Sequence, residues 1–335
     1  MKATAKLPAS RSLPEQSCEE SLDLQTILVA TDLSEESFRA LAYVVPLEER
    51  FDATINLVHA YNSEVQHFLS PAELTRRFQH EMRRRFGRLI APEECHILRG
   101  HPWRQITALA AEVNADLIVA ATHGRTGLKH FMLGSTAEKI VRHSPCPVLI
   151  VRDHARTSAI PRKVLVPVDF SACAKEGADY AARFAGMLGA NLEVMHVVTP
   201  PFVGADLSVA APELTQVMEA ELVKAEDELD RIVNSLPLAN VDADMQVATG
   251  TAVTELVART SANDIDLVVT STHGDSALRH VLLGSVAEEL VRRAHCPVLV
   301  VPSHKRPAAE RELAWIPNLE FAEAWRVSAA IGGAA

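Results

Sequence analysis

The sequence has no apolar run that approaches the roughly 20 residues of a membrane-spanning helix. Its first residues, MKATAKLPASRSLPEQSCEES, contain two lysines but no apolar stretch after them, which argues against a secretory signal. We therefore expect neither a membrane protein nor an exported one, and we predict a cytoplasmic location. The 335 residues, 48% of them apolar, suffice for about two globular domains of ordinary size.

Cysteine is scarce and its pattern excludes two kinds of stabilisation. The five cysteines are odd in number and form no C-x-x-C pair, so neither a disulfide framework nor a zinc site is expected. Cys146 and Cys296 each precede a proline in matching apolar runs, where a buried thiol is the better interpretation.

Positive charge is also in deficit. Lys and Arg number 33 against 43 Asp and Glu, which gives a net charge of −10. Residues 1–152 are balanced, with 18 residues of each sign, so the excess lies entirely in residues 153–335. An acidic protein repels a polyanion, and general nucleic-acid binding is therefore disfavoured.

The sequence does contain an internal repeat. Residues 116–151 read DLIVAATHGRTGLKHFMLGSTAEKIVRHSPCPVLIV, and residues 266–301 read DLVVTSTHGDSALRHVLLGSVAEELVRRAHCPVLVV. The offset is 150, and 20 of the 36 positions are identical without a gap. The chain therefore contains two copies of one domain.

A second match lies upstream at a smaller offset. Residues 27–34 (ILVATDLS) pair with residues 164–171 (VLVPVDFS) at an offset of 137, and His59 pairs with His196. The second copy thus carries 13 extra residues before Gly250, which matches Gly100. An insertion at one place belongs in a loop or a helix extension.

The apolar runs predict the fold class. Residues 27–30, 55–59, 117–120 and 148–151 are short and rich in Val, Ile and Leu, as in strands buried on both faces. Helical patterns lie between such runs; in the second copy one face is predicted to hold the apolar residues Leu214, Val217, Met218, Leu222, Ala225, Leu229, Ile232 and Val233. Alternating strands and helices predict an α/β fold, with two tandem doubly wound parallel-sheet domains.

In such sheets ligands bind beyond the carboxyl ends of the strands. Asp32 and Asp169 follow the first strand of each copy, and a T-H-G turn at residues 122–124 and 272–274 follows a later one. After nine further residues comes Gly-Ser at the start of a predicted helix, as Gly134-Ser135 and again 150 residues later. A helix start offers N–H donors, and glycine permits close approach, so this turn predicts a phosphate site; helix capping by serine is the alternative.

These residues resemble the universal stress protein family in its tandem form. The resemblance rests on the G-x9-G-(S/T) spacing, the V-(P/A)-x-D-x-S start, the strand that ends in histidine and the closing C-P-V-L-(I/V)-V, each present twice. It covers domains at 25–152 and 162–302, with tails at 1–24 and 304–335. It implies the adenine nucleotide alpha hydrolase-like fold, with the two copies paired through their last strands as an intramolecular pseudo-dimer.

The resemblance also implies a set of nucleotide contacts. Asp32 with Ala60, and Asp169 with Val197, would contact adenine and ribose. The implied phosphate contacts are Gly124, Gly134, Ser135 and Thr136 in the first copy, and Gly274, Gly284, Ser285 and Val286 in the second. For His123 and His273, each a lone histidine in a turn, a turn or ligand-orienting role is the better interpretation. ATP or a related nucleotide is the implied ligand, with Mg²⁺ accompanying its phosphates.

Three functions remain open on this sequence. The first is a non-enzymatic stress-response regulator that binds an adenine nucleotide, since His123 and His273 have no nucleophile or second histidine at motif spacing. The second is a slow ATPase or phosphotransferase. The third is a scaffold with empty sites, which Ala121 and Ser271 favour because they replace the first glycine of the family's motif.

Two helices and a tail suggest further contacts. Arginines crowd residues 76–88, whereas the matching helix of the second copy is acidic, and opposite signs favour pairing between chains. A homodimer is therefore a hypothesis beside the pairing within the chain. Residues 304–335 contain two of the three tryptophans, and this tail either docks on the domains or binds a partner.

Overall fold

The computed structural model describes residues 4–5, 22–62, 70–87, 91–122, 133–152, 160–200, 211–262, 264–272 and 283–302. The predicted C-terminal tail, 304–335, lies outside them. In the first repeat the elements are β2 (Thr26–Ala30), α1 (Glu35–Phe51), β3 (Thr54–Tyr61), α2 (Pro71–Phe86), β4 (Cys95–Arg99), α3 (Pro102–Glu112), β5 (Leu117–Ala121), α4 (Ser135–His143) and β6 (Val148–Val151). A short 3₁₀ turn, Pro92–Glu94, precedes β4.

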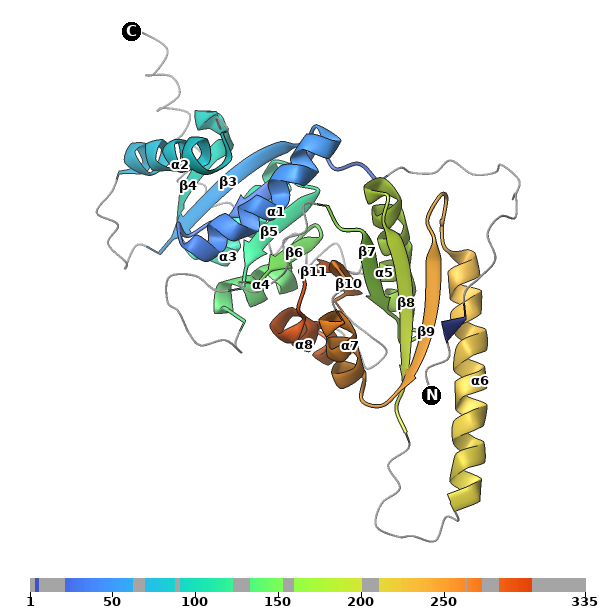
Figure 1. Ribbon diagram of the computed structural model, residues 1–335. Helices are drawn as coiled ribbons and strands as arrows, with labels where there is room; N and C mark the ends of the chain where they lie inside the picture. Colours follow the sequence, from blue (N-terminus) through green and yellow to red (C-terminus); the bar gives the residue numbers. More distant parts are fainter. Residues whose placement is uncertain are drawn as a thin grey trace. The chain divides into compact units, whose positions relative to one another are not determined.

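The second repeat has the same order of elements (Figure 1). They are β7 (Lys163–Pro167), α5 (Ala172–Leu188), β8 (Asn191–Val198), α6 (Ala211–Ser235), β9 (Ala243–Thr249), α7 (Ala252–Ser261), β10 (Leu267–Ser271), α8 (Ser285–Arg293) and β11 (Val298–Val301). A two-residue strand, β1 (Thr4–Ala5), pairs antiparallel with β9.

The eleven described strands form one sheet in the order β1-β9-β8-β7-β10-β11-β6-β5-β2-β3-β4. Within each repeat the strands are parallel, and the chain leaves the first strand in one direction and returns to its other side. This reversal between β2 and β5, and between β7 and β10, is the switch point at which α/β sheets bind ligands. The predicted doubly wound fold is confirmed.

The two repeats join through their last strands. β6 and β11 run antiparallel, with Val148 opposite Val300 and Ile150 opposite Val298. Leu149 lies opposite Leu299, its own counterpart at the offset of 150, so the pairing centres on an internal two-fold relation. The predicted intramolecular pseudo-dimer is therefore confirmed.

The core has one continuous layer on each face of the sheet. Central strands are buried on both faces: Ile27 and Val29 pack toward α1 and α2, while Leu28 packs toward α3 and α4. Each layer contains residues of both repeats, so the halves share their core. The predicted thiols are buried, with Cys146 8% and Cys296 1% exposed.

The helix predictions hold with one correction. The alanine face of α5 is buried and Gly189 ends the helix at φ 66°, in the left-handed region that glycine accepts readily. The insertion lengthens α6 to 25 residues against 16 in α2. The predicted apolar face of α6, however, is buried only from Ala225 onward; Val217 is 52% exposed, because the added turns lie beyond the sheet.

Candidate functional site

The switch point of the first repeat brings three predicted segments together. β2 pairs with β3 on one side and with β5 on the other, both in parallel register. Continuing these registers past the last paired residues sets Asp32 beside Ala60 on one side and Thr122 on the other. The second repeat places Asp169 in the same way beside Val197 and Thr272.

Both aspartates take part in the turn that starts the first helix. An Oδ1 of Asp32 accepts the amide of Ser34 at 3.0 Å, and Asp169 accepts that of Ser171 at 3.1 Å. The serines then cap α1 and α5. The turn interpretation is thus observed for both carboxylates, and a nucleotide contact would add to it.

The residue after each aspartate has an unusual backbone. Leu33 has φ 67° and Phe170 has φ 65°, in the left-handed region where bulky side chains are rare. Both side chains pack against the core layer of α1 and α5, which holds the strained turn in place. Such strain is found preferentially at functional sites, and here it recurs at the same point of both repeats.

A histidine fastens each turn from the neighbouring strand. Nδ1 of His59 lies 2.8 Å from the carbonyl oxygen of Thr31, and Nδ1 of His196 lies 2.8 Å from that of Val168. Because a carbonyl only accepts, each Nδ1 donates. Burial lowers the pKa of His196, so the neutral ring is favoured. These histidines position the aspartate turns, a role the sequence pattern did not reveal.

Polar groups near the turn differ between the repeats. In the first, Oγ1 of Thr31 lies 2.9 Å from Oγ of Ser37 and accepts the amide of Leu33 at 3.0 Å. The corresponding residues of the second repeat are Val168 and Ala174, which have no hydroxyl. Asp32 is half-buried, whereas Asp169 is exposed.

The glycines of the two Gly-Ser pairs make backbone hydrogen bonds that the sequence did not predict. The amide of Gly134 donates to the carbonyl oxygen of Thr122 at 2.9 Å, and that of Gly284 donates to Thr272 at 2.8 Å. A Cβ on Gly134 would lie 2.8 Å from the same Thr122 oxygen, so only glycine fits. Both glycine amides are therefore already bonded within the protein, and the predicted phosphate contacts of Gly134 and Gly284 cannot be made through these two amides.

The residues after each glycine begin a helix that no described side chain caps. α4 begins at Ser135, its first described helical bond is Glu138 N–H to Gly134 O, and no side chain caps its start. Among the described residues, the amides of Ser135 and Thr136 have no acceptor. α8 begins likewise at Ser285, without a capping side chain. A helix start with unbonded amides and partial positive charge suits an anion.

The residues that replace the family's first glycine point toward the α1 and α5 layer. Ala121 packs against that core layer. Cβ of Ser271 lies 3.4 Å from where a Cβ on Gly177 of α5 would be, so the small residue of the helix accommodates the serine. Their side chains are therefore accommodated against the helices of this layer.

Part of the predicted site lies outside the described residues. His123, Gly124, His273 and Gly274 belong to the two segments 123–132 and 273–282. Their predicted contacts stay predictions. The described residues contain no cluster of three metal-ligating side chains, and none of their helices is both long and apolar enough to cross a membrane.

One pair of polar residues was missed although the repeat marks it. Oδ2 of Asp116 accepts the amides of Gln25 and Thr26 at 2.9 and 2.8 Å, and Asp266 does the same for Arg162 and Lys163. Each carboxylate fixes the start of the repeat's first strand. The recurrence of aspartate at the offset of 150 was the available signal.

Comparison with known proteins agrees with this geometry. The model of the universal stress protein family matches residues 24–152 and 161–302. A universal stress protein of Methanocaldococcus jannaschii is 30% identical over 146 residues, which cover 43% of this chain and 84% of the relative.

Two solved structures share the fold over most of the chain. A Pseudomonas aeruginosa protein of unknown function aligns with TM-score 0.63 and 17% identity, over 89% of this chain and 99% of its own. A universal stress protein of Archaeoglobus fulgidus aligns with TM-score 0.55 and 20% identity, over 85% and 99%. With its repeated strand ends, helix starts and family matches, the chain belongs to the universal stress protein family and carries two of the family's domains in tandem.

Proposed function

We propose that this protein is a non-enzymatic stress-response regulator that binds ATP or a related adenine nucleotide at one or both switch points. The observation that carries the proposal is the start of α4 and α8, where amide donors of both repeats find no acceptor among the residues that the structure describes. A triphosphate supplies the acceptors such a helix start lacks.

Each group of the site has a definite part in this proposal. The amides and hydroxyls of Ser135 and Thr136 hold phosphate oxygens, with Mg²⁺ accompanying the phosphates. The carboxylate of Asp32, beside Ala60, accepts from an adenine amino group or a ribose hydroxyl. In the second repeat Ser285, Asp169 and Val197 take these parts, and Val286 contributes only its amide.

The arrangement favours binding over turnover. His59 and His196 donate to backbone carbonyls, so each is engaged in holding a turn. Both aspartates accept backbone amides. These side chains hold the backbone of the two turns in place, which is a structural role. We therefore favour a site that binds a nucleotide over one that hydrolyses it.

Native mass spectrometry of the purified protein tests the proposal. We expect a co-purifying mass of an adenine nucleotide, reduced in the double variant Asp32→Asn/Asp169→Asn. Asparagine keeps the side-chain oxygen that accepts the serine amide, so the turn survives while the charge is lost. A protein that stays empty even after incubation with ATP and Mg²⁺ would support the scaffold function instead.

The ATPase alternative needs a separate measurement. Phosphate release above background, abolished by His123→Ala with His273→Ala, would contradict the non-enzymatic part of the proposal. We expect no release that depends on these two residues, because neither has a catalytic partner at motif spacing.

A further inference from the structure

The first half of α6 presents a surface that the described part of the chain does not cover. No side chain from Thr215 to Lys224 is buried, and the first buried residue is Ala225. Val217 and Val223 are 52% and 58% exposed, the large apolar residues with the greatest exposure in the described protein. Figure 1 shows these turns extending past the strands.

The helix as a whole is acidic, and its exposed face is grooved. α6 contains seven acidic and two basic side chains. A shallow groove of about 550 Å³ runs along it, and its lining includes Val223, two acidic residues and two basic ones, namely Glu219, Asp227, Lys224 and Arg231. An occupant of this groove must therefore cover apolar carbon, and the acidic excess of the whole helix favours an occupant that supplies positive charge.

The equivalent helix of the first repeat has the opposite character. α2 buries Leu74, Phe78 and Met82 against the sheet, and its sequence contains five arginines against two glutamates. Arg76 and Arg83 are both exposed. They are about two helical turns apart in sequence, so they lie along the same outer face of α2.

We propose that the acidic face of α6 docks onto the basic face of α2 from a second copy of this chain. Arginine suits the groove because its aliphatic stem covers apolar carbon while its guanidinium meets carboxylates. Two α6 faces meeting each other would bring their acidic side chains together, which opposes that arrangement. Every chain contains both the acidic face of α6 and the basic face of α2, so identical copies can pair.

Sedimentation velocity of the full chain tests the proposal. We expect association that grows with protein concentration and weakens steeply with added salt, because salt screens exposed charges. A chain that remains monomeric at low salt and high concentration overturns the proposal. Salt-insensitive association also overturns it and would favour apolar pairing of two α6 helices.

A charge swap identifies the two faces. Arg76→Glu/Arg83→Glu and Glu219→Arg/Asp227→Arg should each weaken self-association about tenfold or more, and mixing the two variants should restore it. The control Arg99→Glu/Lys139→Glu changes the net charge by the same amount as the arginine variant, at exposed sites outside both helices. No recovery in the mixture, or an equal loss in the control, would rule out the contact between α6 and α2.

Discussion

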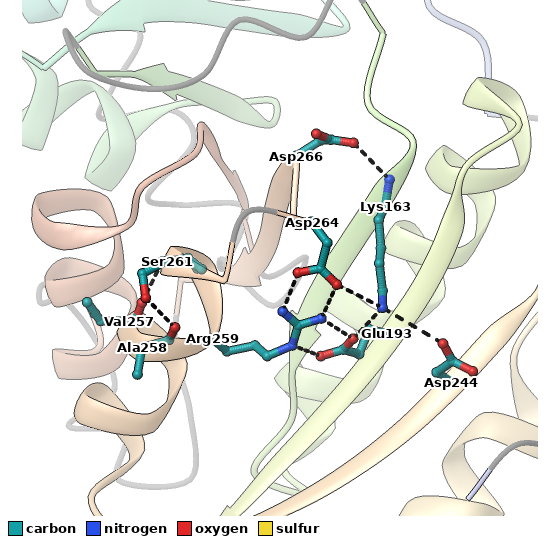
Figure 2. Close-up of polar contacts among 10 residues, drawn as sticks. Lys163, Glu193, Asp244, Val257, Ala258, Arg259, Ser261, Asp264 and Asp266 are labelled. Carbon is teal, nitrogen blue, oxygen red and sulfur yellow. Dashed lines mark hydrogen bonds and ion pairs between the residues drawn. The ribbon is translucent and has the colours of Figure 1, made fainter. Parts of the chain in front are cut away.

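The two repeats have the same fold, but a buried polar residue at one equivalent position has different partners in each. On the second strand of the first repeat, the amide oxygen of Asn56 lies 3.0 Å from Nε2 of His96. The equivalent residue is Glu193, 4% exposed, which binds Arg259 through both carboxylate oxygens and Lys163 at 2.8 Å (Figure 2). One fold therefore accepts either a neutral hydrogen bond or an ion network.

The ion network continues to the surface. Asp264 accepts Arg259 through both of its oxygens, at 2.6 and 2.8 Å, and the guanidinium holds the pKa of Asp264 at about 2. A buried charge is tolerated only when it is paired and hydrogen-bonded. The second repeat therefore needs several charged groups to stabilise this buried position, whereas the first repeat needs only two neutral ones.

The largest expected effect comes from breaking each arrangement by truncation. Glu193→Ala takes the buried carboxylate away from Arg259 and Lys163, which keep only the more exposed Asp264 and Asp244, and we expect a loss of up to about 3–5 kcal/mol in the free energy of unfolding. Asn56→Ala removes one neutral hydrogen bond and should cost about 1–3 kcal/mol. Urea denaturation of the two variants measures the difference, and equal losses would contradict the comparison.

The joint between the repeats should behave symmetrically instead. Leu149→Ala and Leu299→Ala each leave a cavity at the centre of the β6–β11 pairing, where the side chains are 2% and 0% exposed. We expect each to cost about 2–5 kcal/mol, with nearly equal values. Calorimetry that found one replacement neutral would show that the joint is not centred on this pair.

A smaller effect should separate the two proposed nucleotide sites. Thr136 in the first repeat corresponds to Val286 in the second, so Thr136→Val reproduces the second site in the first. A lost hydroxyl bond of about 0.5–1.5 kcal/mol weakens ATP binding roughly two- to tenfold. Val286→Thr should strengthen the second site, and titration calorimetry that showed neither change would leave no role for the hydroxyl.

The smallest effect concerns pH. Burial lowers the pKa of His96, so the folded state binds its proton less readily than the unfolded state. Stability should therefore fall as pH drops below the ordinary histidine value of about 6.5. His96→Gln, which copies Gln246 of the second repeat, should remove part of this dependence. Unchanged pH dependence in thermal unfolding would show that His96 contributes nothing.

The sequence predicted the central strands because residues buried on both faces are almost uniformly apolar. The outer strands β4, at one edge of the sheet, and β9, flanked by the two-residue β1, escaped notice because their side chains are half-exposed, so CHILR and ADMQVAT form no continuous apolar run. For α6 the sequence predicted too much burial, because its apolar face is buried only from Ala225 onward. Apolar periodicity shows which face a helix would bury, whereas the end of the sheet decides how much is buried.

The candidate site was predictable in position but not in detail. Spacing alone brought Asp32 and Ser135 to the same switch point. It could not show that the amide of Gly134 donates to Thr122, because that bond joins the two ends of a loop. For the same reason it could not reveal the contact of His59 with Thr31, which spans two strands.

The most direct test removes the donors that define the proposed site. Proline is favoured at the first position of a helix, and the backbone of Gly134, at ψ 137°, suits a following proline. Ser135→Pro/Ser285→Pro therefore deletes one amide and one hydroxyl per site without breaking either helix.

Titration calorimetry with ATP and Mg²⁺ should show binding to the wild-type protein and a loss of about tenfold or more in this double variant, at an unchanged Tm. The Ser135→Ala/Ser285→Ala variant, which keeps the amides, should lie between them. Equal affinity in the wild type and the proline variant, or no binding in either, would contradict the nucleotide site.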